Sequence, residues 1–259
     1  MIRVSELFIY PVKSLPGISV SEAEVLERGF RYDRRWMIVD VENNCVTQRT
    51  HPQLSQIKIS IVDEQVQLFA NGEEIRLNPS TAQLSVTIWD DQVEAFEGND
   101  LQNEWISDFL GASCKLVFMP EGGKRAVNPD RAKNQENVSF ADGYPYLIIS
   151  EESLADLNDR MAAPLPMNRF RPNIVVFGGE PYAEDQWREM RIGEVSFYGT
   201  HPCKRCVFTT IDQETMQKGA EPLKTLATYR KEGSNVVFGL NALASSRGTV
   251  RVGDQLKLV

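Results

Sequence analysis

The sequence predicts a mainly β protein with peripheral helices, of the α+β class. Short segments rich in β-branched, aromatic or alternating apolar residues follow one another through the first 100 residues, with few helical patterns among them. Turn residues such as Asn71-Gly72 separate these segments and predict tight hairpins. The chain of 259 residues is long enough for two modest cores or one large β-rich core. Such a density of strands is typical of a barrel or a sandwich.

The N-terminal part of the chain holds several expected strands and one helix. The strands are expected at 4–10, 19–27, 36–40, 57–62, 65–69 and 84–89. A helix is expected over 101–110, because Asn99 or Asp100 can cap its start and Gly111 its end. An apolar stripe along this helix is expected to lie in the core, and it consists of Leu101, Trp105, Ile106 and Phe109.

A segment without periodicity, 120–135, separates the two halves of the chain. It combines Gly, Pro and charged residues, so we place the domain join there and expect domains at 1–120 and 121–259. In the second domain, strands are expected at 146–149, 174–177, 194–198, 207–211 and 249–259. One helix is expected from the Ser150 cap to about Met161. Another is expected from Pro222, which suits a first helical turn, through Tyr229.

The charge of the chain limits its partners. A formal net charge of −8, from 28 basic and 36 acidic residues, opposes binding to nucleic acid or to an anionic membrane surface. We expect neither partner, and an anionic ligand would need a local basic pocket. Residues 1–10 alternate in polarity, and no stretch approaches the roughly 18 apolar residues of a membrane span. The expected location is cytoplasmic, with the cysteines reduced.

The most unusual local sequence is a cysteine pair, Cys203 and Cys206, that brackets Lys204 and Arg205. The two cations favour the ionised thiolate, which is a soft-metal ligand or a nucleophile. Three other interpretations remain open. The pair is half of a zinc site, although no second pair is present. It is a thioredoxin-like dithiol, although a strand rather than a helix is expected over 207–211. The cysteines are small buried apolar residues, an interpretation that stays open above all for Cys203.

Polar and basic residues gather in four further short stretches. Lys13 and Ser14 leave the first expected strand together, where a cation, a hydroxyl and loop amides suit a phosphate. Arg34 lies in an arginine-rich connection before the strand at 36–40, and Arg49 follows that strand. Arg171, with Asn173 close behind it, stands at the entrance to the apolar strand at 174–177, a position often used for ligand contacts. Taken alone, the Lys13-Ser14 pair is better explained as a solvent-facing loop, and clustered arginines are usually paired at the surface.

Taken together, these motifs resemble one family, the MOSC proteins that carry an N-terminal β-barrel domain, and the resemblance is strongest to the amidoxime-reducing component and its bacterial relatives. It covers nearly the whole chain. The matching stretches are Tyr10 to Gly17, Asp33 to Trp36, Phe140 to Asn158, Phe170 to Val176, Tyr182 to Trp187 and Cys203 to Asp212. The resemblance implies a MOSC N-terminal β-barrel domain over 1–120 and a MOSC β-barrel domain over 121–259.

The resemblance also implies a cofactor and its ligands. The cofactor is the molybdenum cofactor (Mo-molybdopterin), with the metal bound to Cys206, the second cysteine of the pair. Its phosphate and pterin are then held by basic and polar residues, which map to Lys13, Ser14, Arg34, Arg49, Arg171, Asn173, Lys204 and Arg205. Asp142 corresponds to an aspartate beside the metal and is the candidate catalytic proton handler, or else a turn aspartate before Gly143. The family is further associated with pyridoxal phosphate and with detoxification.

The implied activity is the reduction of small N-hydroxylated compounds, such as amidoximes, hydroxylamines and N-hydroxylated bases. The cysteine pattern of a ferredoxin-like domain is missing, so the electrons are expected from a separate ferredoxin, flavoprotein or cytochrome. Lys204 replaces a small residue that some relatives carry, which leaves specificity open. Two alternatives stay open as well: a sulfur carrier or transferase with a persulfide on Cys206, and a protein that binds the cofactor without turnover.

Overall fold

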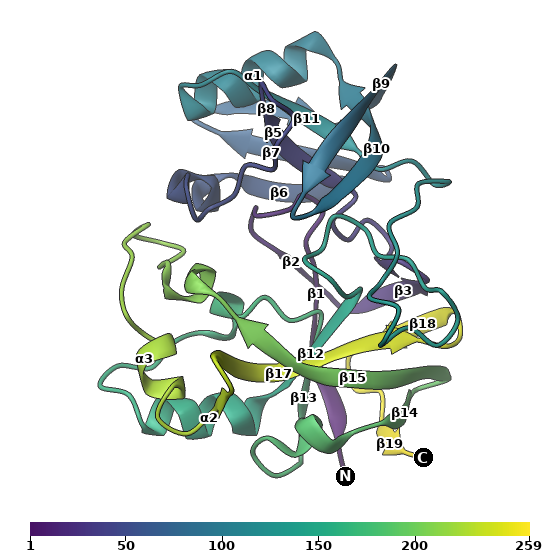
Figure 1. Ribbon diagram of the computed structural model, residues 1–259, viewed down its shortest axis with the longest axis vertical. Coiled ribbons are helices and arrows are strands. Elements are labelled where there is room, and N and C mark those ends of the chain that lie inside the picture. Colours follow the sequence, from purple (N-terminus) through teal and green to yellow (C-terminus); the bar gives the residue numbers. More distant parts are fainter.

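Nineteen strands in four sheets, with short helices beside them, make up the computed structural model, which describes residues 1–259 (Figure 1). The strands are β1 (Arg3–Ile9), β2 (Ile18–Val20), β3 (Glu22–Leu26), β4 (Gly29–Phe30), β5 (Trp36–Asp40), β6 (Lys58–Val62), β7 (Gln65–Ala70), β8 (Glu73–Arg76), β9 (Pro79–Ile88), β10 (Asp91–Gly98), β11 (Cys114–Phe118), β12 (Tyr146–Ser150), β13 (Ile174–Phe177), β14 (Glu189–Ile192), β15 (Val195–Arg205), β16 (Lys231–Glu232), β17 (Asn235–Ala244), β18 (Gly248–Arg251) and β19 (Leu256–Leu258). The α-helices are α1 (Asp100–Leu110), α2 (Glu151–Asp159) and α3 (Leu223–Leu226), and the 3-10 helices are η1 (Pro52–Gln56), η2 (Met167–Arg169), η3 (Ala183–Gln186) and η4 (Val207–Thr210). The predicted mainly β class with peripheral helices is confirmed.

The largest sheet joins the two ends of the chain. Its order is β19-β14-β15-β17-β12-β13-β1-β2, with β16 paired to β17. Strands β12 and β13 run parallel, and α2 provides the crossover between them. The Ser150 hydroxyl caps α2, as predicted, by accepting a hydrogen bond from the amide of Ser153. The N-terminal strand β1 lies beside β13 in this sheet, and β3 pairs with β18.

The first strands of the chain therefore lie in the same lobe as its second half, which Figure 1 shows below the other lobe. The upper lobe contains β5 to β11 and α1. Strand pairing tells which segments lie together in space and does not define domain limits along the sequence. The domain limits 1–120 and 121–259 therefore stay a prediction. No helix of the structure combines the length and the apolar character needed to cross a membrane.

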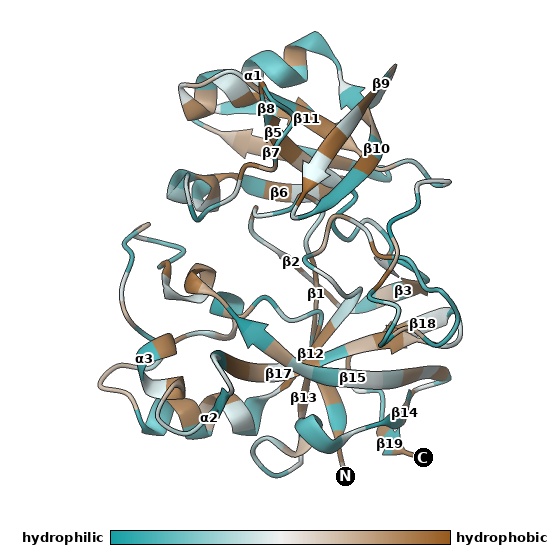
Figure 2. Ribbon diagram, in the orientation of Figure 1, coloured by the Kyte–Doolittle hydropathy of each residue, from teal (hydrophilic) through white to brown (hydrophobic).

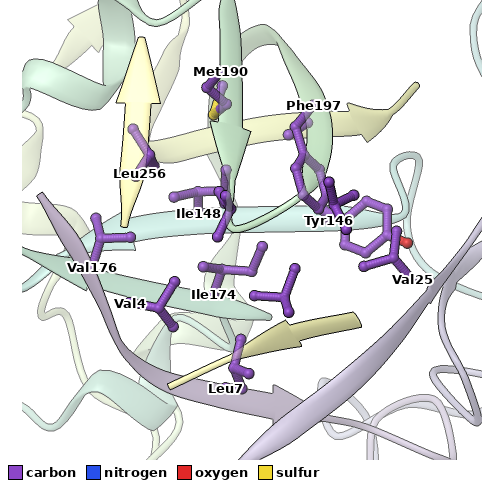
Figure 3. Packing of buried hydrophobic residues seen from close by; sticks show 14 of the residues in the cluster. Val4, Leu7, Val25, Tyr146, Ile148, Ile174, Val176, Met190, Phe197 and Leu256 are labelled. Carbon is purple, nitrogen blue, oxygen red and sulfur yellow. The ribbon is translucent and has the colours of Figure 1, made fainter. Parts of the chain in front are cut away.

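The core of the lower lobe is built from alternate residues of several strands. Figure 3 shows Val4 and Leu7 of β1 facing Ile148 of β12 and Ile174 of β13. All four side chains are almost fully buried. Alternate residues of a strand face the same side, and in β1 a bulge between Val4 and Glu6 shifts this alternation so that Val4 and Leu7 both face the core. Figure 2 shows hydrophobic residues along β17, whereas the end of β15 that leads to the cysteine pair is hydrophilic.

Helix α1 starts and ends as predicted, but its apolar stripe is only partly buried. Asn99 forms a capping box with Gln102, and Gly111 closes the helix with a left-handed backbone (φ 65°). Ile106 is buried, and Trp105 and Phe109 pack at the edge of the core. The expectation for Leu101 was wrong, since 67 % of it is exposed. In the first turn the capping residue Gln102 is the buried one.

Other boundaries differ from the prediction for local reasons. Residues 207–210 of the expected strand 207–211 form the 3-10 helix η4, because the hydroxyls of Thr209 and Thr210 donate to carbonyls three residues earlier and favour a helical turn. The expected strand 19–27 is split into β2 and β3, which pair with different neighbours. The expected strand 249–259 is likewise split into β18 and β19, with Gly253 (φ 91°) between them. Helix α2 ends at Asp159, and α3 at Leu226, earlier than expected.

Candidate functional site

One cavity of about 290 Å³ at the junction of the two lobes brings the candidate residues together. Every one of them lines it: Lys13, Ser14, Arg34, Arg49, Asp142, Arg171, Asn173, Lys204, Arg205 and Cys206. They come from separate connections: those between β1 and β2, before and after β5, before β12, before β13, and at the end of β15. The volume is close to the lower limit of small-molecule sites, roughly 300 Å³.

The charge of this cavity is opposite to that of the whole chain. Its lining carries one carboxylate, that of Asp142. Against this stand the cations Lys13, Arg34, Arg49, Arg171, Lys204 and Arg205. The whole chain has a formal net charge of −8, so the cations are concentrated here. A concave site with this lining attracts anions and stabilises them once bound.

Lys13 and Asp142 form an ion pair across the cavity. Their Nζ and Oδ1 atoms are 2.5 Å apart, and the side chain of Lys13 is 7 % exposed whereas that of Asp142 is 66 % exposed. Enclosure by the cavity walls would raise the pKa of the Asp142 carboxyl, but the Lys13 ammonium, helped by Arg49 and Arg34, holds that pKa well below its ordinary value. Asp142 is therefore ionised at neutral pH. Its side chain bonds to Lys13 rather than to turn backbone, which distinguishes it from a simple turn aspartate.

A buried carboxylate fixes Arg34. Asp33 is 0 % exposed, and its Oδ2 accepts from Arg34 Nη1 at 2.6 Å. Its Oδ1 accepts from the amide of Tyr10 and from Asn173 Nδ2. Burial raises the pKa of Asp33, and the Arg34 charge opposes this effect. Asn173 is 1 % exposed and also accepts from Arg34, so its contacts describe a residue that positions Arg34.

Arg34 and Arg171 share one aromatic neighbour. The guanidinium carbons lie 4.3 Å and 4.2 Å from the centre of the Tyr10 ring. Arg171 also donates to the carbonyl of Leu15 at 2.6 Å. Burial, followed by the nearby charge of Arg34, lowers the pKa of Arg171 to about 10. Arg171 is therefore still charged at neutral pH, and a bound anion would relieve its repulsion with Arg34.

Three residues of the lining have a left-handed backbone although none is glycine. The φ angles are 66° at Ser14, 48° at Arg34 and 56° at Arg171. Such conformations are uncommon for residues with a Cβ and are retained where the surrounding structure requires them, often at functional sites. Backbone strain is thus present at three positions that carry polar side chains of the cavity.

The two cysteines of the pair have different surroundings. Cys203 packs beside the cluster that contains Phe170 and accepts a hydrogen bond from Arg205 Nη1 at 3.2 Å. Cys206 follows β15, is exposed, and lines the cavity with a free thiol. The Nε of Arg205 is buried without a partner. No group of three or more His, Cys, Asp or Glu side chains is placed to hold a metal ion.

Several residues of the site were not recognised in the sequence as site residues. Tyr10 and Asp33 lie inside stretches that were singled out, but their roles depend on contacts between distant segments. His201 lines the cavity, packs edge-on against Tyr144 at 4.9 Å and lies near Asn241. Burial lowers the pKa of His201, and the charges of Arg131 and Lys204 lower it further, so the imidazole is neutral at pH 7.

Comparison with known proteins gives matches over nearly the whole chain. Residues 1–113 match the MOSC N-terminal beta barrel domain and residues 135–257 match the MOSC domain. The mitochondrial amidoxime-reducing component 1 of Mus musculus is 37 % identical, over 99 % of this chain and 82 % of that protein. The molybdenum cofactor sulfurase of Arabidopsis thaliana is 31 % identical, over 91 % of this chain and 32 % of that protein.

Among solved structures, the YUAD protein from Bacillus subtilis aligns with a TM-score of 0.44 and 11 % identity, over 99 % of this chain and 94 % of that one. The family assignment is based on the sequence matches. The two domain matches, together with the relative that matches 99 % of this chain, show that it belongs to the MOSC-domain proteins that carry an N-terminal MOSC β-barrel domain.

Proposed function

We propose that the cavity holds a molybdenum–pyranopterin cofactor and that the protein reduces small N-hydroxylated compounds. The observation that carries the proposal is the combination of an exposed free thiol, Cys206, with six cationic side chains and one carboxylate in a single cavity of an acidic chain. The relatives named amidoxime-reducing components support the reaction class, and the relative named a molybdenum cofactor sulfurase supports the cofactor.

The residues present fit an anionic cofactor with a thiophilic metal. Lys13, Ser14 and Arg171 offer an ammonium, a hydroxyl and a guanidinium, the last two from left-handed backbone, and these donors suit a phosphate. Arg34 and Arg49 extend the basic lining toward the pterin. The unpartnered Nε of Arg205 is a buried donor without an acceptor, as expected at a site built for a ligand. Cys203 and Cys206 both line the cavity, and the exposed free cysteine, Cys206, is the protein ligand suited to a soft metal.

When bound, the molybdenum centre would supply the two-electron chemistry that removes an oxygen atom from nitrogen. The protein supplies orientation and protons. Two electrons and two protons convert the N-hydroxyl group into the amine and water, and the electrons come from a separate ferredoxin, flavoprotein or cytochrome. Binding of a phosphate by Lys13 would weaken its hold on Asp142 and raise the pKa of that carboxyl. Asp142, which is exposed, would then pass protons from solvent.

A second function is favoured by the exposure of Cys206 and by the sulfurase relative. As a sulfur carrier, the Cys206 thiolate would attack a persulfide donor, take its outer sulfur, and release the donor as a thiol. The cationic cavity would then hold an anionic sulfur acceptor. This function requires a persulfide on Cys206 and no resident molybdenum, so the two functions differ in a measurable way.

The deciding experiment compares three proteins made in a molybdopterin-competent host: the unmodified chain, Cys206→Ser, and Cys203→Ser as the matched control. We expect about one molybdenum per chain in the unmodified protein and in Cys203→Ser, but little in Cys206→Ser. Benzamidoxime reduction with dithionite-reduced viologen should follow the same order. Absence of molybdenum from the unmodified protein, with a persulfide found on Cys206 by mass spectrometry, would support the sulfur carrier instead.

A further inference from the structure

A second cavity, of about 310 Å³, lies on the other side of the connection that supplies Arg34. It is formed by the end of β3, the turn to β4, and the first residues of the long segment between β11 and β12, which runs beside β3 and β18 in Figure 1. Arg35 lines this cavity, whereas its neighbour Arg34 lines the first one. The two consecutive arginines therefore serve different cavities.

Four cations and two carboxylates, Glu27 and Glu121, line the second cavity. Arg35 is buried and Arg28 is half-buried, with side chains 10 % and 12 % exposed. Lys124 and Arg247 are exposed at the rim. Burial lowers the pKa of Arg28, and the charge of Arg35 lowers it further, which shows that the two guanidinium groups repel each other. The lining is thus basic in a chain whose net charge is negative.

One carboxylate holds the place that an anion would take. Glu121 Oε1 accepts from Arg35 Nη1 at 2.8 Å, and Oε2 lies 3.4 Å from Arg28 Nη2. The side chain of Glu121 is 80 % exposed, whereas those of Arg35 and Arg28 are 10 % and 12 % exposed. Glu121 is itself largely solvated, so it can rotate into water when another anion takes its place beside the two guanidinium groups. Glu121 is therefore easily displaced.

Further hydrogen-bond donors remain free at this cavity. The Nε of Arg35 is buried and has no partner, in a residue that is 8 % exposed. The amides of Gly122 and Lys124 line the cavity and donate to no group within the protein. Guanidinium groups combined with free loop amides form the donor set that recognises phosphate oxygens. A buried donor without an acceptor costs free energy and indicates a missing partner.

We propose that this second cavity binds the phosphate group of a small phosphate monoester. The phosphate would displace Glu121 and contact Arg35 and Arg28, while Lys124 and Arg247 close over it. A neighbouring cavity of about 400 Å³ shares Leu26, Glu27 and Arg247 with the second one and is lined by Ser245 and Ser246, so the polar remainder of the ester has space to extend. The site is separate from the cavity around Cys206, and the proposal is independent of the molybdenum function.

The test is calorimetric titration of the full-length protein, loaded in a molybdopterin-competent host, with glycerol 3-phosphate and with inorganic phosphate in low-salt buffer. Glu121→Gln should bind glycerol 3-phosphate about threefold tighter, since it removes the competing carboxylate charge. Lys124→Ala combined with Arg247→Ala should weaken binding roughly tenfold, since two charge-assisted contacts are lost. Lys231→Ala combined with Lys257→Ala changes the net charge equally on exposed strands and should change the affinity by less than about twofold.

Glu121→Gln is expected to tighten phosphate binding, and the Lys124→Ala, Arg247→Ala pair to weaken it. These opposite effects on affinity identify the second cavity as the binding site. Tighter binding of the ester than of inorganic phosphate supports a phosphate monoester, whereas equal affinity would show that only the phosphate is recognised and would overturn that part of the proposal. If phosphate bound in the first cavity instead, Lys204→Ala would weaken its binding and Glu121→Gln would leave the affinity unchanged. That result would overturn the second site. No heat of binding in any of the proteins would do so as well.

Discussion

At the scale of single residues, the charge on Asp33 decides where Arg34 lies. This carboxylate has no exposed surface and accepts from Arg34, from the Tyr10 amide and from Asn173. A buried guanidinium that loses its counter-charge is strongly destabilising. The same residue thus supports the stability of the lower lobe and the geometry of the first cavity.

Asp33→Asn should lower the free energy of unfolding by about 2–4 kcal/mol, because it removes the counter-charge of Arg34, whose side chain is only 12 % exposed. Urea denaturation followed by tryptophan fluorescence measures the change. Asp108→Asn, at an exposed position of α1, is the control and should change it by less than about 0.5 kcal/mol. Equal midpoints for the two variants would show that Arg34 needs no buried counter-charge.

His201 makes stability depend on pH near neutrality. Its folded-state pKa is lowered, so as the pH falls the unfolded state, with an imidazole pKa near 6.5, takes up the proton first. The stability contributed by neutral His201 is therefore present above about pH 6.5 and is lost as the pH falls toward the folded-state pKa. The thermal midpoint of His201→Gln should fall less between pH 7.5 and 5.5 than that of the unmodified protein. His51→Gln, which removes the other histidine, should keep the original slope.

The sequence marks the polar lining residues but not how they are arranged. Short motifs around Lys13, Arg34, Arg171 and Cys206 place loop cations beside expected strands, and the structure brings all of them to one cavity. The shared contact of Arg34 and Arg171 with Tyr10 was not predictable. It depends on β1 pairing with β13, which brings residues more than 160 positions apart into contact, as in the hydrogen bond from Tyr10 to the Pro172 carbonyl.

At the scale of elements, β15 sets the position of the cysteine pair. Its register against β17 shifts between Gly199 and His201 and again between Pro202 and Lys204. A Cβ at Gly199 would collide with the carbonyl oxygen of Trp187 and lie 2.8 Å from Leu240 Cδ2. The close approach of these backbones therefore requires a glycine, and the irregular end of the strand directs Cys206 to the cavity.

Gly199→Ala should destabilise the protein by about 1–3 kcal/mol, since backbone must move to admit the methyl group. It should also reduce molybdenum content, because the segment that leads to Cys206 shifts with it. Gly219→Ala is the control, since its Cβ would meet nothing closer than 3.9 Å. Thermal unfolding and metal analysis of both variants give the result, and wild-type stability of Gly199→Ala would contradict the account.

Strands with a simple period were predicted well, and irregular ones were not. The expected segments 36–40 and 57–62 coincide with β5 and β6, where β-branched and apolar residues are continuous or alternate. Strand β17 was missed, since Gly239 (φ 78°) interrupts it and allows Ile149 to approach. The extension of β15 through Pro202 was missed as well, because proline normally argues against a strand interior.

At the scale of the whole molecule, the two halves of the sequence share one sheet. β1 and β2 complete the sheet formed by strands of the second half, and β3 pairs with β18. Fragment 121–259 should therefore fail to fold alone, with poor dispersion of its amide NMR signals. Coexpression with fragment 1–120 should restore a folded complex. A well-dispersed spectrum of fragment 121–259 alone would show that the N-terminal strands are dispensable.

The position of β1 also constrains how the protein is made on the ribosome. Residues 3–9 emerge long before residues 174–177, which are their partner in the sheet. At about 5–20 residues per second, this segment waits roughly 10–30 s for its partner after it leaves the exit tunnel. During that time β1 is an unpaired apolar strand with free edges, which is the kind of segment that chaperones bind. Overproduction without added chaperones should thus yield aggregates that form through the unpaired β1, and the upper lobe should become protease-resistant before the lower lobe.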